Sequence, residues 1–270
     1  MLKRLAAALL IGLVAAQAAA AQTDDEVRVL DWNVTVGIQE DAALAIRESQ
    51  RIAFPQGDYS TGTRTLSIRN FESIEAIGVF EGDMPYTEVE TLQDPGTFTW
   101  AVEGPLVQIR WLFETASEET RTFVILYTIR GAVEFDEGIA NRLLWDAIPP
   151  DHQRPIESAS VTVIVPSGGS VDRDLAPASY GADAEISVDN TLVTFDIGTI
   201  PMGQGARVEV YFRIPDEMAG AHEIELPGGD PNTVIGPAAL LVIEVLVFVG
   251  LAAAIVLFAR SRRRAQLTDQ

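Results

Sequence analysis

The chain has 270 residues, of which 47% are apolar and none is cysteine. This length and apolar content suffice for one large buried core or two smaller ones, and a chain without cysteine forms no disulfide, thiolate metal site or thiol nucleophile. Residues 22–237 carry 13 arginines, no lysine and 37 acidic side chains, a net charge of −24, and a field of that sign excludes nucleic-acid binding and attracts cations and basic partners.

The first 21 residues have the three parts of a secretory signal peptide. Lys3 and Arg4 form a charged start, residues 5–14 are apolar, and small residues follow up to Ala21. The three alanines at 19–21 predict cleavage between Ala21 and Gln22. The alternative, an uncleaved membrane anchor, would need a longer apolar stretch. We therefore expect an exported protein that begins at Gln22.

The next part of the chain has the pattern of β-strands. Its stretches alternate between apolar and polar side chains or are rich in β-branched residues, with turn-forming residues between them, and no strong amphipathic helix is predicted. In the first stretch the alternation slips by one residue, which predicts a β-bulge near Leu30 and Asp31. The expected strands are 27–38, 42–54, 63–69, 71–80, 107–113, 123–133, 142–147, 156–165, 191–195 and 206–214.

Many short strands at this spacing favour an antiparallel β-sandwich. Pro149, Pro150 and Asp151 interrupt the strand pattern. We therefore expect a mainly β ectodomain made of two sandwich-like units, residues 22–150 and a smaller unit at 151–217. A Pro/Gly-rich linker at 218–237 is expected to lead to the membrane.

A second apolar segment, residues 238–259, is long enough to cross a membrane. As a helix its 22 residues would rise about 33 Å, against about 30 Å of hydrocarbon. It is followed by Arg260, Arg262, Arg263 and Arg264. By the positive-inside rule, the tail 260–270 lies in the cytoplasm. The sequence thus predicts a single-pass protein of the plasma (inner) membrane, embedded in the lipid bilayer, with a periplasmic or extracellular ectodomain.

Three residues of the predicted span have possible roles in contacts with another helix. Glu244 is a carboxylate inside a bilayer, which is costly and suggests a function or a partner. It also lies close enough to the outer boundary to reach the interface, so both interpretations stay open. Gly250 and Ala254 are small residues four apart, a spacing that lets a second helix approach closely.

An ordered series of strand motifs resembles one known family. A strand ending in YTIRGAV at 127–133 is followed by the acidic turn at 136–138, a strand that carries Trp145, and a strand that begins at Pro155. In order, spacing and polarity, residues 27–214 resemble the predicted membrane proteins that contain the DUF2207 domain. The resemblance implies a β ectodomain joined to membrane helices. It brings no catalytic motif, because the activity of that family is unknown.

The acidic turns offer candidate ligands for Ca²⁺, a cation that prefers oxygen atoms. Asp136 and Glu137 form one candidate pair, and Asp172 and Asp174 form another. Neither has the EF-hand spacing and Arg173 would repel the ion, so solvated loops are the interpretation that we favour. No glycine-rich phosphate loop lies between a strand and a helix, and we expect no nucleotide and no cofactor.

The remaining residue types with catalytic potential show no catalytic spacing. His152 and His222 are the two histidines of the chain. His152 follows two prolines in a polar turn, and we interpret it as a surface residue, not as a general base. Core packing is the expected role of the tryptophans, although exposed ones would suggest a carbohydrate or peptide platform. They are Trp32, Trp100, Trp111 and Trp145.

These observations predict a membrane-anchored interaction or scaffold module of the cell envelope, with a protein partner and without enzyme activity. An envelope hydrolase with an unrecognised acidic site is the alternative from a different class. A signalling or assembly subunit that acts through its transmembrane helix is the third. A deep pocket with convergent carboxylates would favour the hydrolase, and a flat surface or an open strand edge would favour the interaction module.

Overall fold

The protein is described from a computed structural model, which places residues 26–69, 71–135 and 140–214. Throughout these residues the regular structure consists of β-strands. No helix within them is long and apolar enough to cross a membrane. The predicted signal peptide, the linker, the span with Glu244, Gly250 and Ala254, and the arginine-rich tail all lie outside the described residues.

An eight-stranded sheet forms one layer of the domain. Its order is β15-β16-β12-β1-β2-β9-β4-β5. The strands are β1 (Arg28–Ile38), β2 (Leu44–Phe54), β4 (Ser73–Glu81), β5 (Met84–Pro85), β9 (Glu119–Arg130), β12 (Ile156–Ile164), β15 (Glu185–Asp189) and β16 (Leu192–Ile200).

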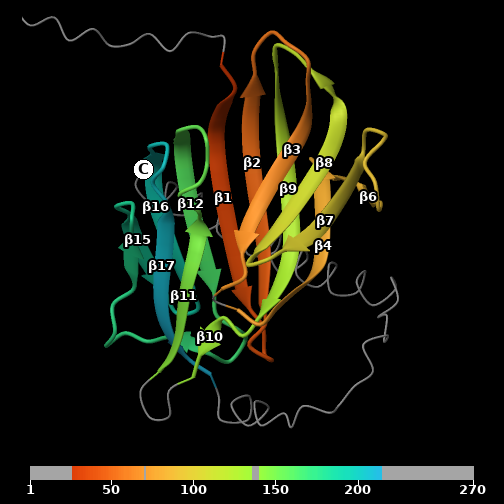
Figure 1. Ribbon diagram of the computed structural model, residues 1–270. Helices are drawn as coiled ribbons and strands as arrows, with labels where there is room; N and C mark the ends of the chain where they lie inside the picture. The colour runs from red at the N-terminus through yellow and green to blue at the C-terminus, as the bar shows by residue number, and fades with distance from the viewer. Residues whose placement is uncertain (1–25, 70, 136–139, 215–270) are drawn as a thin grey trace, which may run out of the picture.

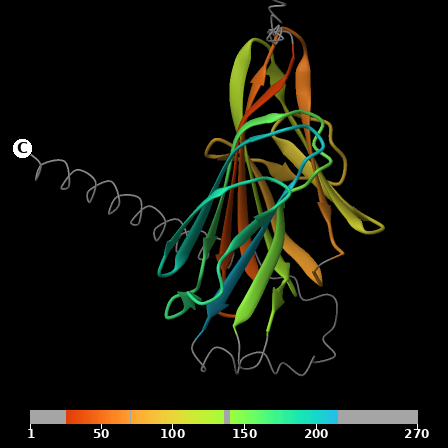
Figure 2. The same ribbon diagram turned by 90° about the vertical axis from the view of Figure 1, so that its left-hand side faces the viewer.

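Two smaller sheets lie side by side over one face of the eight-stranded sheet (Figure 1). The four-stranded sheet has the order β3-β8-β7-β6, with β3 (Tyr59–Ser67), β6 (Thr87–Glu88), β7 (Thr97–Glu103) and β8 (Leu106–Ala116). The five-stranded sheet has the order β10-β11-β17-β13, and β14 pairs with β17 as well. Its strands are β10 (Val133–Glu134), β11 (Asn141–Ile148), β13 (Ser170–Val171), β14 (Ala178–Tyr180) and β17 (Ala206–Arg213). The turned view shows the strands of both layers running along the long axis (Figure 2).

One hydrophobic core fills the space between the layers. The alternation of side chains along each strand supplies this core, because successive side chains of a strand point to opposite faces. In β8 the residues Val107, Ile109, Trp111 and Phe113 are buried, and the residues between them are not. Trp111 and Phe113 pack on Phe123 of β9, with ring centroids 5.6 and 4.9 Å away. These contacts hold the four-stranded sheet on the eight-stranded one.

The segments on the two sides of residue 150 meet in one sheet. β12 pairs with β1 in parallel, in a register that runs from Val29–Ile156 to Gly37–Ile164. The two expected sandwich-like units therefore share a continuous eight-stranded layer. The layer is mixed, since β1–β12 is parallel and its other pairs are antiparallel. Parallel pairing needs a long crossover, and here most of the domain lies between the two strands.

Local features of the prediction are confirmed at the level of single strands. The register of β1 against β2 shifts between Val29 and Asp31, which is the expected bulge. The strand expected at 63–69 begins earlier, at Tyr59. β7 and β15 were not among the expected strands, and both carry exposed residues along much of their length, so their apolar alternation is short.

Candidate functional site

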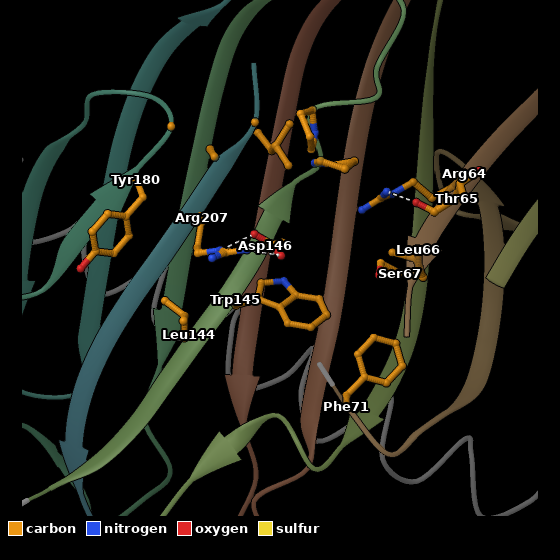
Figure 3. A pocket seen from close by; sticks show the side chains of 16 residues that line it. Arg64, Thr65, Leu66, Ser67, Phe71, Leu144, Trp145, Asp146, Tyr180 and Arg207 are labelled. Carbon is orange, nitrogen blue, oxygen red and sulfur yellow. Dashed lines mark hydrogen bonds and ion pairs between the residues drawn. The ribbon is translucent and has the colours of Figure 1, made fainter. Parts of the chain in front are cut away.

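A cleft separates the four-stranded and five-stranded sheets where β3 faces β11 (Figure 3). The cavity has a volume of about 380 Å³, within the range of about 300–1,000 Å³ that is typical of ligand sites. One wall is formed by Arg64, Thr65, Leu66 and Ser67 of β3. The other is formed by β11, with residues of β17 and β14 behind it.

The β3 edge directs unpaired main-chain groups into the cleft. The Ile68 N–H donates to the Pro105 carbonyl at 2.9 Å, which continues the register of β3 against β8. Because bonded and non-bonded pairs alternate in an antiparallel ladder, the main-chain groups of Thr65 and Ser67 face away from β8. The Thr65 carbonyl, which faces away from β8, accepts a hydrogen bond from the Arg64 guanidinium. The N–H of Thr65 and both main-chain groups of Ser67 thus face the cleft.

The direction of the β17 main chain follows from a contact on its far side. The Asp172 N–H donates to the Tyr211 carbonyl at 2.8 Å, in register with the β13–β17 pairing. The main-chain groups of Tyr211 therefore face away from β11. By the same alternation the main-chain groups of Glu209 also face away from β11, toward β14. The main-chain groups of Val208 and Val210 face β11.

The β11 edge consequently has a free side that faces β3. Trp145 pairs with Val208, so its main-chain groups are directed to β17. Those of Leu144 and Asp146 point the other way. β10 pairs with β11 only at Leu143 and Arg142, so no described strand pairs with the β11 edge from Leu144 onward. The cleft is therefore bounded by two strand edges.

The charged side chains that line the cleft have partners within the domain. The Arg64 Nε and Nη2 donate to the two carboxylate oxygens of Glu48 at 2.8 and 2.7 Å, and Tyr127 Oη donates to the same carboxylate at 2.5 Å. The Arg207 Nε and Nη2 donate to the Asp146 carboxylate at 2.5 and 2.9 Å. The lining thus carries no unpaired charge.

The environment of this buried cluster shifts two pKa values. Burial raises the pKa of Tyr127 well above its usual range, and the Glu48 carboxylate adds to that effect. Burial alone would lower the pKa of Arg64, but Glu48 more than offsets it, and the pKa of the guanidinium is raised. Arg64 therefore stays charged and Tyr127 stays neutral at physiological pH. The Arg64 guanidinium also lies 5.3 Å from the ring centroid of Trp32.

Aromatic and proline side chains also line the cleft. Trp145 extends from β11 toward the space between the strands, and Phe71 lies at the lower end (Figure 3). Their ring centroids are 6.1 Å apart. Pro149 and Pro150 line the cleft as well. The Nε1 atom of Trp145 is buried without a hydrogen-bond partner among the described residues, a condition that costs about 1–3 kcal/mol.

Of the predicted calcium ligands, Asp172 and Asp174 lie in the described part of the chain. The Asp172 carboxylate accepts bonds from the N–H groups of Asp174 and Leu175 at 2.9 and 3.2 Å, and Arg213 Nη2 lies 2.7 Å from it. Burial opposes ionisation, but these contacts prevail and lower the pKa of Asp172. Within the described residues no group of three or more His, Asp or Glu side chains is placed to hold a metal ion. Asp136 and Glu137 lie outside those residues, and that candidate pair stays untested.

The predicted aromatic and histidine residues have structural contacts. Trp32, Trp111 and Trp145 are buried, as expected for core residues. Trp100 is partly exposed, and its Nε1 donates to Glu88 at 3.0 Å. The two ring nitrogens of His152 lie 2.6 and 2.7 Å from the carbonyls of residues 154 and 204. His152 therefore joins two loops, and His222 lies outside the described residues.

The sequence did not identify the cleft itself. Its walls are Thr65 and Ser67 on one side and Leu144 and Asp146 on the other, and none of these residues stands out in a strand pattern. The one local signal is the Pro149–Pro150 pair, which marks the end of β11. Which strand lies at a sheet edge depends on the topology. The local alternation of apolar and polar side chains carries no information about that topology.

Fold and site together define an all-β domain with a cleft between two sheet edges. The chain belongs to the family described as predicted membrane protein (DUF2207), N-terminal domain, whose model matches residues 28–212. This confirms the resemblance noted in the sequence and identifies the protein as a predicted membrane protein. No curated protein matches the sequence.

Several solved structures are similar to the chain at low identity. A proposed protease from Parabacteroides distasonis is 12% identical, with a TM-score of 0.41, and the match covers 68% of this chain and 40% of that one. For an M1 zinc metallopeptidase from Deinococcus radiodurans the identity is 13%, the TM-score 0.33 and the coverages 67% and 42%. A proposed nutrient-binding protein from Legionella pneumophila is 9% identical, with a TM-score of 0.43, and the match covers 69% of this chain and 68% of that one. The chain thus spans about two fifths of the first two proteins.

Proposed function

We propose that the protein is a membrane-anchored module of the cell envelope that binds another protein through its β domain. The family is one of predicted membrane proteins. The predicted signal peptide at 1–21 and the predicted span at 238–259 support an anchored protein whose domain faces the periplasm or the exterior. In this proposal the sandwich-like layers form a rigid ectodomain and residues 260–270 lie in the cytoplasm.

The observation that carries the proposal is the cleft between β3 and β11. Its charged side chains, Arg64, Asp146 and Arg207, are each paired with a side chain of opposite charge. The lining therefore offers shape, apolar contacts and free main-chain groups, which are the features of a recognition surface. The acidic surface of the ectodomain adds long-range attraction for a basic partner.

The proposed topology is tested with protease on intact spheroplasts. Protease added outside should digest the ectodomain and leave a tag at the C-terminus intact, because the tag would lie in the cytoplasm. Loss of the tag under the same conditions would reverse the orientation. A cytoplasmic protein of the same cells is the control for leakage.

Binding is tested by affinity capture of the full-length tagged protein from crosslinked membranes. We expect a specific partner protein, recovered less well at high salt because exposed charges are screened within about 8 Å at physiological ionic strength. An unbiased hydrolase screen on the same preparation tests the alternative class. Reproducible turnover that a single Asp or Glu substitution abolishes would replace the binding module with an enzyme.

A further inference from the structure

We propose that the cleft takes up an extended segment of the partner polypeptide as an added β-strand between β3 and β11. This inference rests on the proposed function, since it specifies the partner's chemistry and where it binds. The added strand would join the four-stranded and five-stranded sheets into one layer over the eight-stranded sheet. The occupant is a main chain of another protein with apolar side chains at the positions that face inward.

Main-chain groups on both walls point in the direction that such a strand needs. Thr65 and Ser67 direct N–H groups into the cleft from β3, and Leu144 and Asp146 direct theirs from β11. A strand that pairs with an open sheet edge gains its affinity from these main-chain hydrogen bonds, and its side-chain specificity from alternate pockets. The open part of β11, residues 144–148, is roughly 16 Å long at about 3.3 Å per residue. That length accommodates about five residues of an added strand.

The chemistry of the lining favours a neutral ligand with hydrogen-bond acceptors. Glu48 neutralises Arg64, and Arg207 neutralises Asp146, so a charged ligand in the cleft would lie there without a counter-charge. A peptide main chain is uncharged and carries one carbonyl acceptor per residue.

The charge of the ectodomain specifies what flanks the strand. Residues 22–237 carry a net charge of −24, and the cleft itself contributes no unpaired charge. A partner segment with basic residues on either side of a short apolar core would therefore be attracted at long range and bound by neutral contacts. We expect selected ligands to share that layout.

The test uses the full-length protein in detergent and a phage-displayed library of random dodecapeptides without cysteine. We expect selected peptides with a basic flank and an apolar core. On binding they should slow hydrogen exchange at the amides of Thr65, Ser67, Leu144 and Asp146. Failure to select any peptide, or protection confined to other strands, would contradict the added strand.

A pair of variants at one position tests the main-chain contact directly. Thr65→Pro removes an N–H that faces the cleft and not β8, so the β3–β8 pairing stays intact, and an edge strand tolerates proline there. Affinity for the selected peptide should fall about tenfold or more, the effect of one lost hydrogen bond. Thr65→Val keeps the N–H and should bind within about twofold of the original. Unfolding of both variants is compared with that of the parent, and equal affinity in the two folded variants would overturn the proposal.

A third variant distinguishes the partner from the chain's own residues 215–237. Replacing this segment with a Gly/Ser linker of the same length should leave exchange at Thr65 and Ser67 unchanged in the absence of peptide. Faster exchange at both amides would show that the segment itself covers the cleft, and the partner proposal would be wrong.

Photo-crosslinking in cells separates this inference from the proposed function. A photoreactive residue is placed at Ser67 in the cleft, or at Asn33, which is exposed on the opposite face of the eight-stranded sheet. A partner captured from Ser67 and not from Asn33 supports both proposals. Capture from Asn33 alone would keep a binding module and overturn the cleft as its site, and capture from neither would overturn both.

Discussion

Arg64 and Glu48 form a two-contact ion pair inside the domain, with side chains that are 4% and 0% exposed. Arg64 lies on β3 and Glu48 on β2, so the pair joins the wall of the cleft to the sheet beneath it. Tyr127 of β9 adds a third polar group to the same carboxylate. Removing either charge leaves the other buried without a counter-charge, and the two residues must therefore be considered as a unit.

Arg64→Met should destabilise the protein by about 3–5 kcal/mol, because the Glu48 carboxylate would stay buried without a counter-charge. The double variant Glu48→Leu/Arg64→Met should recover much of that loss, since well-packed apolar residues often replace a buried ion pair at no net cost. Chemical denaturation of the purified protein and its variants measures both effects. A double variant that is less stable than both single ones would show that the two side chains contribute independently and not as a unit.

Gly62→Ala should destabilise the protein by about 1–3 kcal/mol through overpacking. Gly62 of β3 lies under Trp111, and a Cβ there would come within 2.0 Å of the indole ring. Gly37→Ala is the matched control, because its Cβ would meet only the Ala45 carbonyl, at an ordinary 3.7 Å. Thermal unfolding compares the two alanine variants. Equal melting temperatures would mean that the indole ring of Trp111 relaxes freely.

The sequence contained the local structure of the domain and little of its topology. The alternation of β8 and the slip at Asp31 of β1 are visible in the chain, because side-chain direction in a strand has a period of two residues. The pairing of Val34 with Val161 in β12 is not visible, since many apolar strands could take that place. A division at residue 150 was natural from the prolines alone, yet the two segments share a sheet.

The candidate site depends on that same topology, which is why the sequence did not reveal it. The paired charges give no local signal, because Glu48 and Arg64 are read in the chain as ordinary polar positions of two strands. Only the packing of β3 over β2 brings them together, 16 residues apart in sequence. The candidate calcium residues, in contrast, were visible as an acidic turn, and Asp172 makes its own contacts with the main chain and Arg213.

Protonation of Glu209 should destabilise the folded protein in acid. Burial opposes ionisation of Glu209, but bonds from Tyr180, Tyr211 and Arg142 prevail and lower its pKa below the ordinary 4.5. A lowered pKa in the folded state means that the stabilisation is complete above about pH 4.5. It is lost as the pH falls through the lower pKa of the folded state.

Glu209→Gln should therefore be less stable than the parent at pH 7, by about 1.5–3 kcal/mol for hydrogen bonds to a charged group. The difference should narrow below pH 4.5, where the carboxylate of the parent becomes protonated in turn. Glu103→Gln, at an exposed position of β7, is the control. Denaturation curves between pH 7 and pH 3 measure both variants, and a difference that stays constant over that interval would contradict the assignment.

Glu244→Leu should leave membrane insertion and partner capture unchanged. The apolar residues of 238–259 and the four arginines that follow are sufficient for insertion in the predicted orientation, and the proposed binding site lies in the β domain. A carboxylate that only reaches the interface would be neutral to replace, or its loss would be mildly stabilising. Ile243→Leu is the matched control within the same segment.

Alkaline extraction measures insertion, and affinity capture from crosslinked membranes measures the complex. If capture fell sharply in Glu244→Leu and not in Ile243→Leu, with insertion intact, the partner would be recognised within the membrane. The protein would then be a signalling or assembly subunit, and the cleft would not be its main contact.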